Sequence, residues 1–243
     1  MSHCNNLAEL LHAICRKPGT RISRAPDPHD AFSVRVYSGN FLIGIQCVHD
    51  HGIVHDFSRQ KVVRLLAAFN GISLGAISSQ PYFADLIELF AAASDNESSH
   101  DEIIRDASAH ALTGIKQLAS EHATGGPPNE SLVECVLAAF RRKDAQICRS
   151  QYNDGSVQAL VKNEGIYLEC HDAEGYLASP EHKPPDSINL LFCGSRFTLH
   201  SNDPKFAELV AMLRGFSRDP ARFSNLRNDI FQAATLMLAN LAA

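Results

Sequence analysis

The sequence lacks any run approaching the 18 or so apolar residues that a membrane-spanning helix requires. Its opening stretch, MSHCNNLAEL, has neither the basic segment nor the apolar core of a signal peptide. The seven cysteines are an odd number without a C-x-x-C pair, which is typical of reduced thiols rather than of a disulfide framework. The net charge of −5 leaves no basic excess for nucleic acid. We therefore expect a cytoplasmic protein that binds neither membranes nor nucleic acid.

The sequence also lacks the short motifs that specify a reaction. Neither phosphate-loop pattern, G-x-x-x-x-G-K or G-x-G-x-x-G, occurs, and no HExxH, EF-hand or zinc-ribbon spacing is complete. We therefore expect no resident cofactor. Hydrophobic residues make up 45% of the 243 residues and charged residues 20%, so the chain can bury a sizeable core without disulfide bonds.

An internal repeat appears when the chain is shifted by 123 positions. Residues 33–90 then align with residues 156–213 without a gap, and 13 of the 58 aligned positions are identical. Ordinary residue usage predicts about 3 or 4 identities by chance. The identical pairs are Ser33/Ser156, Val34/Val157, Asn40/Asn163, Ile43/Ile166, Cys47/Cys170, Gly52/Gly175, Phe69/Phe192, Gly71/Gly194, Ser78/Ser201, Pro81/Pro204, Phe83/Phe206, Ala84/Ala207 and Leu86/Leu209.

A linker separates the two copies. The segment TGGPPNE, residues 124–130, holds two glycines and two prolines, a composition typical of a domain boundary. We therefore predict a first α+β repeat over residues 1–123 and a second over residues 124–243.

Each repeat reads as a helix, an antiparallel sheet and further helices. Asn6-x-x-Glu9 and Ser131-x-x-Glu134 are capping-box patterns that open a helix. The alternating segments FSVRVY and FLIGIQC, like SVQALV and IYLEC, predict paired strands, followed by a turn at a glycine and a third strand. The segments PYFADLIELF and PKFAELVAML predict amphipathic helices. The fold class is α+β, with two tandem copies packed as a pseudo-dimer.

Two segments allow two interpretations. Residues 60–71 and 184–194 are apolar runs that each end at a glycine, so each is either a short helix with the glycine at its C-terminus or one arm of a hairpin with the strand that follows. The closing helices are clearer. Ser99-x-x-Glu102 predicts the start of the first, and Asp219-Pro220 the start of the last.

Histidines and cysteines are the candidates for chemistry. His49 and His51 share one side of a strand, and with His55 they could hold a divalent metal. An exposed hairpin turn is the favoured alternative, because the second repeat keeps none of the three histidines. Cys47 and Cys170 lie in the inward phase of paired strands, where a thiol is an inert apolar group.

The order of elements resembles the effector-binding chaperones of bacterial type III secretion, small acidic α+β proteins that dimerise. The resemblance is carried by LAELLHAICRK, FSVRVYSGNFLIGIQC, VVRLLAAFNGISLGAIS and ARFSNLRNDIFQAATLMLANL. That family would have another strand where PYFADLIELF and PKFAELVAML predict helices. The resemblance implies a covalent pseudo-dimer that holds an unfolded segment of a secreted effector protein.

We therefore expect a non-catalytic protein-binding module, and a cysteine- or metal-dependent hydrolase that uses one copy is the alternative. Leu42, Ile43, Ile45 and Leu168 are the sheet positions proposed to contact a partner protein. Which face of the sheet is core and which is available to a partner stays open at this point.

Overall fold

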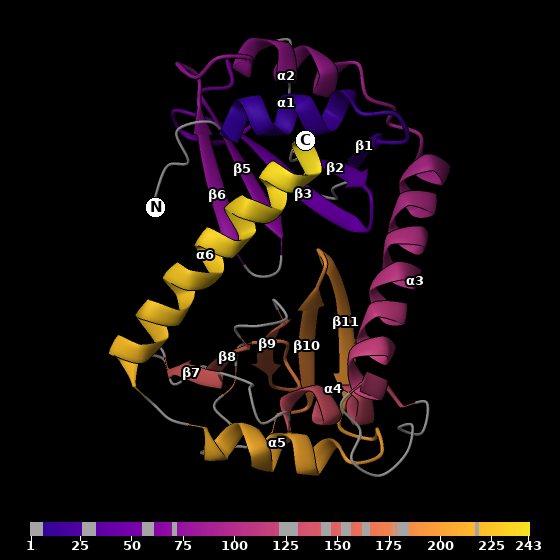
Figure 1. The fold of residues 1–243 in the computed structure, drawn as a ribbon, viewed down its shortest axis with the longest axis vertical. Coiled ribbons are helices and arrows are strands. Elements are labelled where there is room, and N and C mark those ends of the chain that lie inside the picture. Colours follow the sequence, from indigo (N-terminus) through magenta and orange to yellow (C-terminus); the bar gives the residue numbers. More distant parts are fainter. Residues whose placement is uncertain are drawn as a thin grey trace. The chain divides into compact units, whose positions relative to one another are not determined.

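The protein is mixed α+β, with six helices and two antiparallel sheets in the part of the chain that the computed structural model describes (Figure 1). This confirms the α+β part of the predicted fold class. The described residues are 7–25, 33–54, 61–69, 72–121, 131–141, 147–151, 157–161, 166–176, 178, 185–216 and 219–243.

The first repeat forms a six-stranded sheet. The strand order is β1-β2-β3-β5-β6, and the short strand β4 pairs with β3. The elements are α1 (Leu7–Arg16), β1 (Arg21–Ala25), β2 (Ser33–Ser38), β3 (Phe41–His49), β4 (Gly52–Ile53), β5 (Arg64–Phe69), β6 (Ile72–Ile77), α2 (Phe83–Ala91) and α3 (Glu97–Glu121).

The second repeat forms a five-stranded sheet with the order β11-β10-β9-β8-β7. Strands β10 and β11 and the start of α5 lie 123 positions after β5, β6 and the start of α2, which is the shift that the sequence repeat requires. The elements are α4 (Leu132–Phe140), β7 (Ile147–Gln151), β8 (Val157–Val161), β9 (Ile166–His171), β10 (Ser187–Phe192), β11 (Ser195–His200), α5 (Phe206–Gly215) and α6 (Pro220–Ala242).

One face of each sheet is covered by the opening helix and the helix that follows the last strand. Residues Leu7, Leu11 and Ile14 are fully buried at helical spacing along α1, which lies beside α2 (Figure 1). Full burial of one such side chain contributes about 1.5–3 kcal/mol. The core of the first unit also contains Ile43, Ile45, Cys47, Leu65, Ala67, Leu74, Phe83, Leu86 and Phe90, and that of the second contains Val136, Leu137, Ile166, Leu168, Ile188, Leu190, Phe206, Leu209 and Leu213.

The hairpin interpretation of the two ambiguous apolar runs is correct, and the helical one is wrong. Strand β5 pairs with β6, and β10 neighbours β11 in the second sheet. The turn between β10 and β11 has positive φ at both central residues, 49° at Cys193 and 81° at Gly194, as a two-residue hairpin requires. A glycine at a helix C-terminus needs the same backbone conformation, which is why the pattern alone left the choice open.

The structure confirms the predicted start of α6 and corrects the predicted start of α3. Asp219 caps α6 as predicted, because its Oδ1 accepts hydrogen bonds from the N–H of Ala221 (2.9 Å) and Arg222 (3.1 Å). Helix α3 instead starts two residues before Ser99, where Asn96 Oδ1 accepts from Ser98 N at 3.0 Å. Ser131 is the N-cap of α4 but makes no side-chain capping bond.

The strands differ from the prediction in number and length, and the predicted cap of the first helix cannot be compared. Asn6 lies outside the described residues. Strands β1 and β7 were not predicted, and the third strand expected after Gly52 is only the two-residue β4. Helices α2 and α5 lie where they were predicted.

The chain divides into two compact units that combine segments of both repeats. Unit 1 comprises Met1–Ala109, Cys193–Ser195 and Gln232–Ala243, and unit 2 comprises His110–Phe192 and Arg196–Phe231. Helices α3 and α6 therefore each contribute residues to both units. Within unit 1, the first half of α3 packs Ile103 and Ala107 against Tyr37 and Leu42.

Candidate functional site

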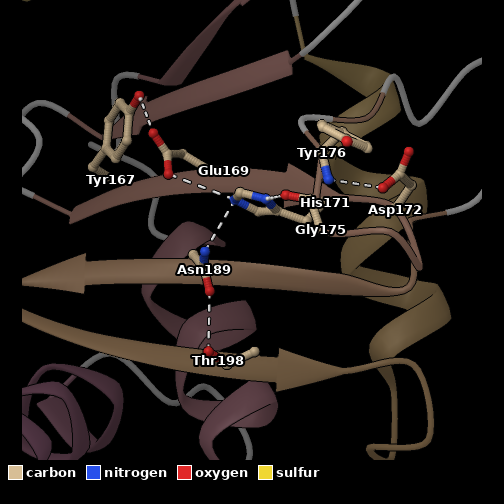
Figure 2. A network of polar contacts seen from close by, with 8 residues as sticks. All are labelled: Tyr167, Glu169, His171, Asp172, Gly175, Tyr176, Asn189 and Thr198. Carbon is tan, nitrogen blue, oxygen red and sulfur yellow. Dashed lines mark hydrogen bonds and ion pairs between the residues drawn. The ribbon is translucent and has the colours of Figure 1, made fainter. Parts of the chain in front are cut away.

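A network of polar side chains lies on strands β9, β10 and β11 of the second sheet (Figure 2). Tyr167, Glu169 and His171 alternate along β9 and therefore share one face. Asn189 of β10 is the register partner of Glu169, and Thr198 of β11 continues the row on the same face. The opposite face carries the buried core side chains of the same strands.

The contacts of His171 determine its neutral tautomer. Its Nδ1 lies 3.1 Å from Gly175 O, which can only accept, so Nδ1 carries the proton. Its Nε2 lies 3.0 Å from Asn189 Nδ2 and accepts a hydrogen bond from that amide. The amide orientation agrees, because Asn189 Oδ1 accepts from Thr198 Oγ1 at 3.0 Å. The hydrogens are assigned from this network of contacts.

Glu169 adds a negative charge beside the imidazole. Its Oε1 accepts a hydrogen bond from Tyr167 Oη at 3.0 Å, and its Oε2 lies 3.6 Å from His171 Nε2. The side chains of His171 and Glu169 are only 16% and 20% exposed.

The turn after β9 is held by its own side chain. Asp172 Oδ1 accepts hydrogen bonds from the N–H of Glu174 at 3.1 Å and of Tyr176 at 2.8 Å. The turn leaves Tyr176 73% exposed (Figure 2). Together with the bond from His171 to Gly175, these contacts fix the end of β9 beside the network.

The sheet positions expected to contact a partner are all in the core. Leu42, Ile43, Ile45 and Leu168 are 5%, 0%, 0% and 1% exposed. Their place in the sheets agrees with the alternation, but their side chains face the interior of the protein. The structure therefore gives no support to a role for these four side chains in binding a partner from solution.

Of the three histidines proposed as metal ligands, the structure describes His49 and His51. His51 N donates a hydrogen bond to His49 Nδ1 at 3.1 Å, and the two rings meet edge to face with centroids 6.0 Å apart. His55 lies outside the described residues. Across the described ranges, no group of three His, Cys, Asp or Glu residues is placed to hold a metal ion.

The described thiols are poorly suited to nucleophilic catalysis. Burial raises the pKa of Cys15 and of Cys47 from 9.0 to about 12, and that of Cys193 to about 11. Burial also raises the pKa of Cys135. These four thiols are therefore protonated at neutral pH, whereas attack requires the thiolate.

No helix in the described part of the chain is long and apolar enough to cross a membrane. No family model, no curated protein and no solved structure matches the chain. The resemblance to secretion chaperones stays a prediction.

The polar network was not predicted from the sequence. Its signal is the alternation Tyr167-x-Glu169-x-His171 on a strand whose other residues are apolar. Asn189 lies 18 positions after His171, and Thr198 lies 27 positions after it, so only the pairing of the strands brings the three side chains into one network.

Proposed function

We propose that the protein is a non-catalytic protein-binding module of the secretion-chaperone type, whose two repeats correspond to the two subunits of a dimer. In the cytoplasm, it would hold an unfolded segment of a partner protein. A secreted effector is one such partner. Free thiols are found at Cys15, Cys47, Cys135, Cys170 and Cys193, which agrees with a reducing compartment.

The observation that carries the proposal is that unit 1 contains residues from both repeats. That unit takes Cys193–Ser195 and Gln232–Ala243 from the second repeat. Within it, Leu42 N donates to Cys193 O at 3.0 Å, and Gly39 lies beside the Leu241 side chain. Segments contributed by one copy to the fold of the other are typical of subunits that assemble obligatorily.

The chemistry of the described side chains supports binding rather than catalysis. The buried thiols of Cys15 and Cys47 are protonated, because burial raises the pKa of each to about 12, and the polar network around His171 satisfies its own hydrogen-bond donors and acceptors. A general acid or base needs a group that can reach a substrate. His171 is directed instead at Gly175, Asn189 and Glu169 (Figure 2).

The experiment compares the binding of an unfolded and a folded form of one test protein. Fluorescein-labelled α-lactalbumin, reduced and carboxymethylated so that it stays unfolded, is titrated with the full chain, and fluorescence polarisation is measured. The disulfide-intact, folded form is the matched control. We expect saturable binding of the unfolded form alone, and equal signals from both forms, or no binding, would refute the proposal.

The correspondence with a dimer is tested separately by light scattering. A chain whose repeats replace two subunits should have the molar mass of one chain, 26.6 kDa. A stable dimer of the full chain would contradict this part of the proposal and leave the binding result standing.

A further inference from the structure

The outer edge of strand β1 is covered by residues 92–96, the connector between α2 and α3. Strand β1 is the terminal strand of its sheet, so its outward N–H and C=O groups need a partner other than a strand of that sheet. Arg24 N donates to Ser94 O at 2.7 Å, and Ser23 and Ser94 form a parallel bridge. The connector therefore occupies the edge that another extended chain would use.

Side chains hold the connector in place. The Arg24 guanidinium donates a hydrogen bond to Ala91 O, and its Nη1 lies 3.9 Å from Asp95 Oδ2. Asn96 N donates to Ser94 Oγ at 3.1 Å. We call residues 92–96 with Ser23, Arg24 and His100 the β1 latch.

His100 in the first turns of α3 contacts the buried side of the β1 latch. Its Nδ1 lies 3.2 Å from Ser23 Oγ, and Ser23 is 0% exposed. Burial lowers the pKa of His100 below its ordinary 6.5, and the charge of Arg35 on β2 lowers it further. Asp101, the next residue on α3, opposes the shift. The closed latch therefore favours the neutral imidazole.

We propose that the β1 latch is an acid-sensitive switch in which protonation of His100 releases the connector and uncovers the β1 edge. Among the described residues, the charges of Arg35 and Asp101 act on His100, and the latch itself contains the Arg24–Asp95 pair. A second positive charge in this half-buried place faces Arg35, whereas the open latch leaves the imidazolium in water. The uncovered edge offers backbone groups to which an extended segment of another chain can add.

The direction of the pH effect follows from proton linkage. The open state binds a proton near pH 6.5, and the closed state binds it only at lower pH. The closed latch is therefore fully stable above pH 6.5 and loses stability as pH falls below that value. If the closed state stays neutral, the opening constant at pH 5.5 is about tenfold larger than at pH 7.5.

The second repeat supplies a matched substitution. Phe223 occupies the position 123 residues after His100, also near the start of a closing helix, and is 8% exposed. The variant His100→Phe therefore carries a side chain that this fold already accommodates at the equivalent position. The variant His100→Gln keeps a group that can bond to Ser23 Oγ without titrating.

The test is amide hydrogen exchange of the full chain at pH 7.5 and pH 5.5, with the Arg24 amide as the reporter and correction for the intrinsic rate. We expect the protection of this amide to fall at pH 5.5 in the wild type, by at most about tenfold, and to stay constant in H100F and H100Q.

Two results would overturn the proposal. One is unchanged protection of the Arg24 amide between the two pH values in the wild type. The other is an equal loss of protection in the wild type and in H100Q, which would place the sensitivity in another group. Protection of amides in the buried strand β3 serves as the control for unfolding of the whole unit.

Discussion

The two repeats share much of their order of elements and differ in the side chains that these elements carry. Tyr82 and Lys205, at equivalent positions before α2 and α5, both have a φ of 63°. Tyr82 stacks on His12 with centroids 4.7 Å apart, whereas Lys205 Nζ pairs with Glu134 Oε1 at 2.7 Å. The comparison teaches that position in the fold determines the backbone conformation, and each repeat stabilises it with different contacts.

The sheets differ in the same way on the face away from their covering helices. Val48 and Leu66 of the first repeat correspond to His171 and Asn189 of the second. The first pair is apolar and the second forms the centre of the polar network. In the closing helices the first repeat carries the polar residue and the second the apolar one. His100 of the first repeat corresponds to Phe223 of the second.

The largest expected effect breaks the turn of the β10–β11 hairpin at Gly194. This residue has a φ of 81°, and a Cβ there would overlap the backbone oxygen of Leu42. We expect Gly194→Ala to lower the free energy of unfolding by about 3 kcal/mol, measured by urea titration. Gly175→Ala is the control, since its φ is 82° and no atom lies within 4 Å of the added Cβ, so about 1 kcal/mol is expected. Equal losses would contradict the overlap.

A smaller loss of stability is expected when residues of the polar network are replaced by the residues at the equivalent positions of the first repeat. Asn189→Leu introduces the residue found at position 66 and removes the partner of both His171 and Thr198. We expect a loss of about 1–2 kcal/mol in thermal or urea unfolding. In a double-mutant cycle with His171→Val, the double variant should lose less than the sum, because the two residues share one hydrogen bond. Strict additivity would show that the network is not coupled.

The contacts before α2 and α5 differ in how much they stabilise. Lys205→Met leaves the Glu134 carboxylate, whose side chain is 12% exposed, without its cation. Its Oε2 already has no hydrogen-bond partner among the described residues. We expect a loss of about 1 kcal/mol, against about 0.5 kcal/mol for Tyr82→Met, which removes only a ring contact. Glu134→Gln added to Lys205→Met should restore part of the loss, and no recovery would refute the ion-pair explanation.

The smallest effect concerns the thiols at alkaline pH. The unfolded chain releases thiol protons near pH 9, whereas burial raises the pKa of Cys15 and Cys47 to about 12 and of Cys193 to about 11 in the folded protein. The unfolded state therefore binds fewer protons, and the free energy of unfolding falls as pH rises above about 9. We expect about 0.4 kcal/mol per thiol at pH 9, and Cys47→Val should reduce the slope. An unchanged slope would show that Cys47 is not responsible.

The elements that were predicted correctly are those whose signals are local. Helices α2, α5 and α6 follow from apolar spacing, and Asp219 identifies the start of α6 because its side chain caps the backbone next to it. Strand β5 could not be distinguished from a helix, because the run RLLAAF is apolar at consecutive positions and shows no period. Strand β1, RISRA, has too few apolar residues for its pattern to predict a strand.

By itself, the sequence determined the duplication, the α+β class and the main helices, because identity at a fixed shift and helical periodicity are seen along the chain without knowledge of which segments meet in space. The tertiary structure decided that Leu42, Ile43, Ile45 and Leu168 face the core. It also decided which distant polar groups meet, as in the pairs His171 with Asn189 and His100 with Ser23. The physical reason is that strand register and the burial of one sheet face depend on contacts between segments far apart in the chain.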